Sequence, residues 1–340
     1  MNEHSVIGLD IAKSVFQVHS VDTTTGQIVR TKLRRKQVLE FFAKQPPQRV
    51  ALEACGSAHW WARQLASLGH RVTLLPPRLV RPFVLRNKTD AADAQAIWTA
   101  AQQPGIKVVA VKSPLQQSIL ALHRIRAQLL KMRIMQSNAV RGLLYEFGII
   151  LPQSDRAMSQ QLPAQWAALE REVPAFLMES LREQWQRVCE FTRQLAAIDR
   201  RLEHIRKQDP HCEAVSSIPG IGVLTATAAV AAMGDPRTFR SGREFAAWLG
   251  LVPRQSGTGG RVRQLGISKR GDAYLRTLLM HAARSIIIRR PSWAWLTEIL
   301  RRRPFNVVVA ALANKLARTI WAVLAHGRPY EPMFLQSEPA

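Results

Sequence analysis

The chain has 340 residues, of which 47% are hydrophobic, and its 48 Lys and Arg against 24 Asp and Glu give a formal net charge of +24. This length allows two or three domains, and the hydrophobic content excludes wholesale disorder. Such an excess of positive charge indicates a polyanionic partner, and nucleic acid releases its counterions when a basic surface binds it. A basic enzyme unrelated to nucleic acid is the alternative.

The apolar residues and the cysteines argue against a membrane or exported protein. No stretch of about 20 uninterrupted apolar residues is present, the length that a membrane-spanning helix needs. The first nine residues lack a basic start, a long apolar core and a small-residue cleavage site. Cys55, Cys189 and Cys212 are widely spaced and odd in number, which fits neither a disulfide framework nor a zinc site. We therefore expect the protein in a reducing cytoplasm.

The first hundred residues alternate between strand and helix patterns. A short apolar run, a partly alternating strand and a strand after a Thr-Gly turn come first, and helical and strand patterns then alternate, separated by prolines or a glycine. The predicted strands are residues 5–9, 15–21, 27–33, 49–53 and 70–75, and the predicted helices between them are residues 36–44 and 59–68. This order predicts an α/β domain, with a mixed sheet covered by helices.

Residues 115–144 and 173–207 change to helical spacing, with few glycines or prolines. Residues 152–163, bounded by prolines, are the predicted break between these two helices. Two long helices of this kind commonly form an αα-hairpin or a coiled-coil arm, although two ordinary core helices would show the same pattern. From residue 216 onward the pattern is again helical, interrupted by glycine loops.

Acidic residues are scarce, so their positions in the first domain are informative. Asp10 and Glu53 each end a predicted strand, where side chains point into the crevice in which ligands usually bind. Asp90 and Asp93 lie three residues apart at the start of a predicted helix, residues 89–101, and therefore share one face. Four gathered carboxylates repel one another unless cations neutralise them, and oxygen-only ligands suit Mg²⁺ or Mn²⁺. Taken singly, Asp10 fits a turn and Asp90 a helix N-terminus equally well.

A glycine-containing segment, residues 217–222 (Ser-Ile-Pro-Gly-Ile-Gly), precedes a run rich in Ala, Thr and Val. This segment resembles a helix-hairpin-helix motif. Gly220 and Gly222 would let the backbone approach a phosphate closely, and the following helix would offer it free N–H groups. A simple tight turn between two helices is the alternative.

A second glycine-rich segment, residues 250–272, is basic, and no acidic residue lies between Phe245 and Gly271. Such a loop, carrying hydroxyl side chains, is suited to holding a phosphodiester beside a nucleophile. A purely electrostatic contact with DNA is the alternative. The side chains predicted to bind nucleic acid here are Arg254, Arg261, Arg263, Lys269 and Arg270.

Three runs of the N-terminal domain resemble the DEDD transposases of the IS110 family, in particular its IS1111 subgroup. These runs are GLDIAK at residues 8–13, LEACG at 52–56 and RNKTDAADA at 86–94. The resemblance spans nearly the whole chain, because it continues through YLRTLL at 274–279, Asn306, Asn314, Lys315, Trp321 and AHGR at 325–328.

The resemblance implies a RuvC-like, RNase H-type fold for the N-terminal domain and a DNA recombinase activity. It implies that the four carboxylates named above, Asp10, Glu53, Asp90 and Asp93, bind the catalytic metal. Asn87 and Lys88 precede the two helical aspartates, and we expect both to reach a phosphate, an inference from charge that the resemblance does not supply.

In that family a serine of the glycine-rich loop attacks DNA and becomes covalently attached to it. The family's serine generally lies four or five positions after the proline of a Pro-Arg pair, and here these positions are Gly257 and Thr258. Ser256 lies three positions after Pro253. Thr258 aligns without a gap, but its β-branched hydroxyl is a more hindered nucleophile. We predict Ser256 as the nucleophile, with Thr258 as the alternative.

The resemblance also implies partners and an assembly. Family members work with a structured guide RNA, the bridge RNA, which pairs with donor and target DNA, so that the protein mainly reads backbone and shape. They assemble as dimers that pair into a tetramer at the DNA synapse. We therefore expect a bacterial, nucleoid-associated recombinase with a RuvC-like domain (residues 1–108), a helical coiled-coil arm (109–208) and a mostly α-helical transposase domain (209–340).

Two other functions fit parts of the same pattern. A Holliday-junction nuclease would share the fold and the metals but would use water as its nucleophile. A non-catalytic nucleic-acid scaffold would need neither metal nor nucleophile. A covalent protein–DNA adduct distinguishes a recombinase from the nuclease, and Mg²⁺ binding that is lost on mutating Asp10 argues against the scaffold.

Overall fold

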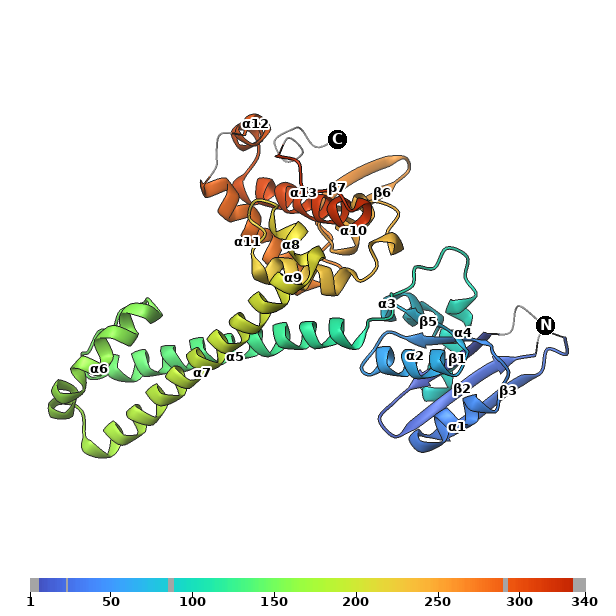
Figure 1. The fold of residues 1–340 in the computed structure, drawn as a ribbon, viewed down its shortest axis with the longest axis horizontal. Helices are drawn as coiled ribbons and strands as arrows, with labels where there is room; N and C mark the ends of the chain where they lie inside the picture. The colour runs from blue at the N-terminus through green and yellow to red at the C-terminus, as the bar shows by residue number, and fades with distance from the viewer. Residues whose placement is uncertain (1–5, 23, 85–88, 290–292, 333–340) are drawn as a thin grey trace. The chain divides into compact units, whose positions relative to one another are not determined.

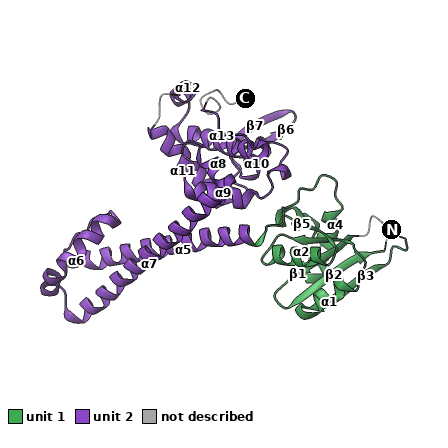
Figure 2. Ribbon diagram, in the orientation of Figure 1, with its two compact units in different colours: residues 1–114 green, residues 115–340 purple. Residues whose placement is uncertain are grey.

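The computed structural model describes residues 6–22, 24–84, 89–289 and 293–332 (Figure 1). The chain divides into two compact units, residues 1–114 and 115–340, which Figure 2 shows in different colours. The first unit contains the five-stranded sheet, and the second contains the long helices together with a separate two-stranded hairpin. The predicted boundary near residue 208 falls inside the second unit, and the division into three domains stays a prediction.

The sheet of the first unit has the strand order β3-β2-β1-β4-β5. Strands β1, β2 and β3 are antiparallel neighbours, whereas β1, β4 and β5 run parallel to one another. This is the mixed sheet that the sequence predicts, and it is consistent with an RNase H-like domain. The strands are β1 (Val6–Ile11), β2 (Val15–Val21), β3 (Ile28–Arg34), β4 (Arg49–Glu53) and β5 (Arg71–Leu75).

Alternation along the strands divides the first unit into two cores, one on each face of the sheet. Leu9 and Leu52 face one core, which includes Trp61 of α2, and Val6 and Ala51 face the other. The second core includes Ala96 and Ile97 of α4. Successive side chains of a strand point to opposite faces, so Asp10 shares the α4 face with Val6, and Glu53 shares it with Ala51. The helices of this unit are α1 (Val38–Ala43), α2 (Ala58–Ser67), α3 (Pro77–Val80) and α4 (Asp90–Ala101).

The second unit begins with a helical arm made of α5 (Pro114–Tyr145), α6 (Asp155–Glu172) and α7 (Ala175–Gln208). Helices α5 and α7 run antiparallel and side by side, with α6 at the far end (Figure 1). The Arg126 guanidinium donates to the Asp199 carboxylate at 2.6 Å, and Gln136 donates to Gln184 further along. The bounds of α5 and α7 agree with the two predicted long helices to within two residues.

The predicted break at residues 152–163 is wrong from Asp155 onward, because α6 begins there and contains Pro163. The Ser154 hydroxyl accepts from the backbone N–H of Ala157 and so caps the helix. A proline inside a helix costs one hydrogen bond, about 3 kcal/mol. Burial of Met158 and Leu162 against the arm's core offsets this cost.

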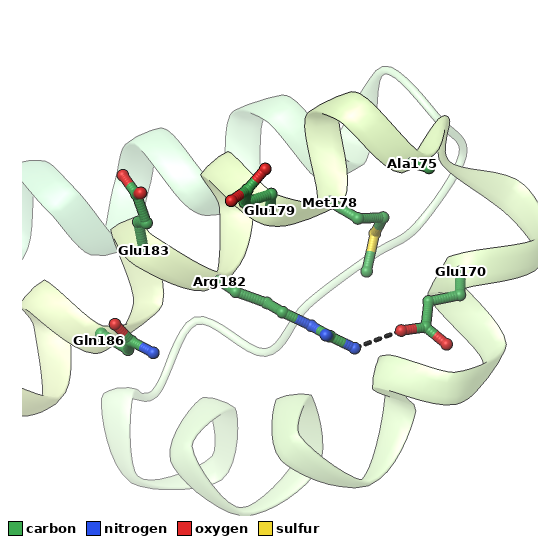
Figure 3. Close-up of a pocket in the computed structure, with 7 residues that line it drawn as sticks. All are labelled: Glu170, Ala175, Met178, Glu179, Arg182, Glu183 and Gln186. Carbon is green, nitrogen blue, oxygen red and sulfur yellow. Dashed lines mark hydrogen bonds and ion pairs between the residues drawn. The ribbon is translucent and has the colours of Figure 1, made fainter.

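The distal half of the arm differs in charge from the rest of the chain. Residues 146–190 contain seven acidic and four basic residues, whereas the whole chain carries +24. A cavity of about 560 Å³ lies here between α6 and α7, where Arg182 pairs with Glu170 (Figure 3). The cavity contains none of the predicted site residues; its lining is Glu170, Ala175, Met178, Glu179, Arg182, Glu183 and Gln186.

The rest of the second unit is a helical bundle around one apolar core. Among the described residues, α13 is the single helix long and apolar enough to cross a membrane, with a mean hydropathy of 1.6. Leu312, Leu316 and Ile320 are fully buried in the core, so α13 is the central helix of this bundle. The helices are α8 (Pro210–Ser216), α9 (Val223–Met233), α10 (Gly242–Trp248), α11 (Ala273–Arg289), α12 (Ala294–Arg302) and α13 (Phe305–His326).

Candidate functional site

The first part of the site depends on how closely α4 lies against β1. A Cβ built on Gly8 would stand 2.8 Å from the Cβ of Trp98, closer than real Cβ atoms approach. Only glycine therefore fits between β1 and α4 at this point. The close approach brings the first turn of α4 to the strand end that carries Asp10. This turn is capped by Thr89, whose hydroxyl accepts from the backbone N–H of Ala92 at 3.2 Å.

Three of the four predicted carboxylates converge. Asp10, Asp90 and Asp93 each offer a carboxylate oxygen, and these atoms all lie within 4.8 Å of one another. Asp90 and Asp93 also lie at the N-terminus of α4, where the helix dipole favours negative charge. Three adjacent carboxylates form an oxygen-only donor set, which fits a hard divalent cation.

Glu53 lies beside this group but is not one of its three members. In the parallel register Leu9 is opposite Leu52, so the next residues along, Asp10 and Glu53, are neighbours on the same face of the sheet. Burial raises the pKa of the Cys55 thiol, and the negative charges of Glu53 and Asp10 raise it further. Both carboxylates therefore lie near Cys55, where the parallel strands β1 and β4 end. The predicted phosphate contacts of Asn87 and Lys88 lie outside the described residues.

The basic segment predicted as a loop is instead a β-hairpin, made of β6 (Pro253–Thr258) and β7 (Arg261–Ile267). Gly259 and Gly260 form its turn with φ angles of 55° and 78°, the left-handed values that a two-residue type I′ turn requires. Every residue of β6 is exposed, so the apolar alternation of a half-buried strand is absent. The Gly-Gly pair was the one available signal for this hairpin.

Both candidate nucleophiles lie on β6 and are exposed. Ser256 pairs with Arg263 across the hairpin, and Thr258 pairs with Arg261. Arg254 lies at the start of β6, where the register is irregular, and Lys269 and Arg270 follow β7. All five basic side chains that the sequence singles out here are exposed.

The root of the hairpin is held by the helical bundle. The Arg276 guanidinium of α11 donates to the carbonyl oxygens of Leu249 and Arg270, on either side of the hairpin, at 2.8 and 3.0 Å. The Asn314 side chain of α13 donates to the carbonyl oxygen of Leu251 at 3.2 Å. These bonds fix where the two strands leave the bundle, although the strands themselves are exposed.

The helix-hairpin-helix-like segment joins α8 to α9. Gly220 has a φ of 81°, and a Cβ there would stand 2.8 Å from the Cδ1 of Ile286 on α11. Gly220 therefore allows close packing within the bundle. This agrees with a simple tight turn between two helices, the alternative to a phosphate-binding motif. Gly222 is exposed at the N-cap of α9, where a Cβ added to it would meet no atom within 4 Å, and it leaves room for a ligand.

A buried polar cluster at the root of the arm was missed by sequence reasoning. The His123 ring of α5 lies 3.0 Å from the Tyr274 hydroxyl of α11 and 3.0 Å from the Thr227 hydroxyl of α9. Burial lowers the pKa of His123 to about 4, and the positive charge of Arg126 contributes to this shift. The three residues are far apart in the sequence, so no spacing indicates that they meet.

Comparison with known proteins identifies the family. The family model described as "Transposase IS116/IS110/IS902 family" matches residues 212–297, and the IS110 DEDD transposase model matches residues 7–149. The first match contains the basic hairpin, and the second contains all four predicted carboxylates.

Three relatives are similar over nearly the whole chain. A probable family 20 transposase of Pseudomonas aeruginosa is 46% identical, covering 96% of this chain and 99% of the relative. The transposase of element IS1328 of Yersinia enterocolitica is 37% identical, covering 95% and 97%. That of element IS1111A of Coxiella burnetii is 35% identical, covering 97% and 92%. The chain therefore belongs to the IS110 family of insertion-sequence transposases, DEDD enzymes that cleave and join DNA with a divalent metal.

Proposed function

We propose that this transposase exchanges DNA strands at a metal site formed by Asp10, Glu53, Asp90 and Asp93. The convergence of Asp10, Asp90 and Asp93 within 4.8 Å is the observation that carries the proposal. Their oxygen donors suit Mg²⁺ or Mn²⁺, and Glu53, on the same face of the neighbouring strand, would complete the set. A divalent ion held there supplies charge stabilisation for phosphodiester displacement.

We propose that Ser256 is the nucleophile, with Thr258 as the alternative. The serine oxygen forms a bond to a backbone phosphorus, and the bond from that phosphorus to one deoxyribose oxygen breaks. The leaving oxygen takes up a proton and becomes a free hydroxyl, while the serine proton passes to solvent. Attack by a deoxyribose hydroxyl of a second DNA reverses these bond changes and joins the strands. The exposed position of Ser256 on a hairpin without acidic residues supports this role.

A suicide DNA substrate tests this chemistry, because a nick beside the scissile bond traps the covalent intermediate. Denaturing gel electrophoresis should show a protein–DNA adduct with the wild type and the Thr258→Ala variant, and none with Ser256→Ala. An adduct that disappears with Thr258→Ala and persists with Ser256→Ala would assign the nucleophile to Thr258. Cleavage without any adduct would favour water, and thus a Holliday-junction-type nuclease.

We infer that an element-encoded bridge RNA supplies the sequence specificity. The net charge of +24 favours binding to RNA and DNA backbones. The family resemblance supports a guide RNA as one of these partners. Sequencing of RNA that copurifies with the protein from cells carrying the whole element tests this inference. A single structured RNA with segments complementary to both DNAs is expected, and efficient recombination by RNA-free protein would contradict it.

We propose that basic residues around these centres bind the phosphate backbone at the bacterial nucleoid. The set includes the exposed end of the helix-hairpin-helix-like segment at Gly222, where α9 presents free N–H groups. Gly220 supports this segment from within the bundle. The side chains of the set are Lys88, Arg254, Arg261, Arg263, Lys269 and Arg270.

We propose further that chains pair along α5 as a coiled coil, forming dimers that assemble into a tetramer. Ile125, Met132, Met135 and Leu143 are exposed on α5, on the side away from the residues that pack on α7. A second apolar stripe at near-heptad spacing suits another helix. Light scattering should therefore show dimers for the wild type and monomers for a Met132→Glu, Met135→Glu variant.

A further inference from the structure

The register of the β6–β7 hairpin pairs each candidate nucleophile with its own arginine. Ser256 lies opposite Arg263, and Thr258 lies opposite Arg261. Directly opposite residues of antiparallel strands project from the same face, with their Cβ atoms about 4.5–5.5 Å apart. One face of the hairpin therefore carries two hydroxyls interleaved with two guanidinium groups. The opposite face has Gly257 across from Val262.

The two arginines are free to bind an anion. Both are exposed, and neither forms an ion pair with any of the residues that the structure describes. The hairpin contains no carboxylate that would compete for them. Their positive charge is therefore available to an anionic ligand.

A phosphate under attack by Ser256 would lie beside the guanidinium of Arg263, because the two residues are paired. A nucleophile oxygen must come within about 3–3.5 Å of the phosphorus. The non-bridging oxygens of a phosphate above Ser256 then lie over the Arg263 position, and a guanidinium matches two such oxygens with two parallel N–H donors. Arg261 lies two residues away along β7, about 7 Å, and faces the phosphate that would stand above Thr258.

We propose that Arg263 is a catalytic residue, which holds the non-bridging oxygens of the phosphate that Ser256 attacks and stabilises the charge that develops on them. This inference rests on the proposed serine chemistry. It adds that the strand register determines which arginine contacts the reacting phosphate, whereas the total positive charge of the hairpin does not. Arg261 has a different role, which is to bind DNA without contacting the reacting phosphate.

The hairpin geometry keeps this pair together as the DNA arrives. Arg276 and Asn314 hold the root of both strands, so the hairpin is presented from a fixed base. Backbone pairing between β6 and β7 then keeps Arg263 opposite Ser256 without a direct bond between the two side chains. A preorganised donor of this kind stabilises a transition state without reorganisation during the reaction.

The test compares Arg263→Ala with Arg261→Ala on the suicide substrate. DNA affinity is measured by fluorescence anisotropy, and the adduct rate is then measured at saturating DNA. Both variants should weaken binding to a similar extent. Only Arg263→Ala should slow adduct formation at saturation, by about 10²–10³-fold, the usual effect of removing one such donor. Arg263→Lys should recover part of the rate, because an ammonium supplies charge without the bidentate geometry.

Two control variants accompany these measurements. Arg156→Ala removes the same charge from the exposed surface of α6, and Gln264→Ala alters β7 on the opposite face of the hairpin. Neither should change the adduct rate at saturating DNA.

The outcomes separate this proposal from the proposed function. Equal adduct rates for Arg263→Ala and Arg261→Ala at saturation would overturn the pairing while leaving the serine nucleophile in place. A rate defect confined to Arg261→Ala would also overturn it, and would indicate Thr258. If the wild type forms no adduct at all, the covalent chemistry fails and the catalytic role of Arg263 fails with it.

Discussion

Gly8 on β1 and Ala94 on α4 approach so closely that a Cβ on Gly8 would stand 2.4 Å from the carbonyl oxygen of Ala94. This contact involves backbone, so a Gly8→Ala variant must displace α4 and with it Asp90 and Asp93. We expect a loss of about 1–3 kcal/mol in the free energy of unfolding, the usual cost of overpacking. We also expect weaker Mn²⁺ binding, measured by isothermal titration.

The control for this prediction is Gly56→Ala, at a glycine with no atom within 4 Å of an added Cβ. Its stability should equal that of the wild type. Unchanged Mn²⁺ affinity in Gly8→Ala would mean that the close seating of α4 does not form the metal site.

Charge repulsion predicts an unusual response for an Asp90→Asn variant. Without metal, removing one of three clustered carboxylates relieves repulsion, so the variant should be at least as stable as the wild type in EDTA. With Mn²⁺ at 100 times its dissociation constant, the wild type should gain about 2.7 kcal/mol in unfolding free energy, and the variant much less. Urea denaturation with and without Mn²⁺ measures both effects.

Glu40→Gln serves as the matched control, since Glu40 is an exposed carboxylate of α1 that pairs with Lys44, the residue after the helix. It should retain the full stabilisation by Mn²⁺. An Asp90→Asn protein that Mn²⁺ stabilises as strongly as the wild type would exclude Asp90 as a ligand.

The buried His123 predicts an acid-sensitive arm root. Its pKa in the folded protein is about 4, below the unfolded value of 6.5, so the unfolded chain binds more protons between these two values. Stability is therefore fully present above pH 6.5 and is lost as pH falls towards 4, by up to about 3 kcal/mol. The charged or titratable groups near the ring are Arg126, Asp199, Asp272 and Tyr274.

Urea denaturation at a series of pH values tests this, with His123→Gln as the comparison. Glutamine does not titrate, so the variant should lose less stability than the wild type between pH 6.5 and 4. Parallel curves for the two proteins would show that protonation of other groups causes the acid sensitivity.

Complementation tests whether an active site combines carboxylates from one chain with a hydroxyl from another. An Asp10→Ala chain and a Ser256→Ala, Thr258→Ala chain should each be inactive alone. Mixed, they should regain part of the recombination activity, because some sites then combine two intact halves. Such an arrangement would keep the nucleophile from activated phosphate until the DNAs assemble. A mixture that forms mixed oligomers and stays inactive would place the site within one chain.

Sequence patterns predicted the first unit well because burial is strongly periodic there. The buried strands β1 and β4 are short apolar runs that carry Asp10 and Glu53 at or next to their last residues, and their order leads directly to the mixed sheet. The pattern places both carboxylates at the carboxyl ends of two neighbouring strands. It does not reveal that Gly8 seats α4 tightly, because that contact depends on a helix far along the chain, although a glycine inside a strand is a signal for close approach.

The hairpin escaped prediction because its strands bury nothing. All of β6 is exposed, so its sequence shows no alternation of buried and exposed side chains. Only the Gly259–Gly260 turn indicates a hairpin. The break predicted at Pro163 was wrong for the opposite reason. Packing of Leu162 and its neighbours stabilises a helix that the local sequence disfavours. Local propensity decides where tertiary contacts are few, and yields where they are many.

The reversal of charge along the arm gives the second unit an electric polarity. Residues 146–190 carry more negative than positive charge, in a chain that is otherwise strongly cationic. A polyanion therefore repels the distal arm when that end comes near it, and attracts the basic bundle when the bundle comes near it. The field acts over about one Debye length, roughly 8 Å at physiological salt. Orientation is therefore selected before contact, which disfavours encounters in which the distal arm meets the nucleic acid first.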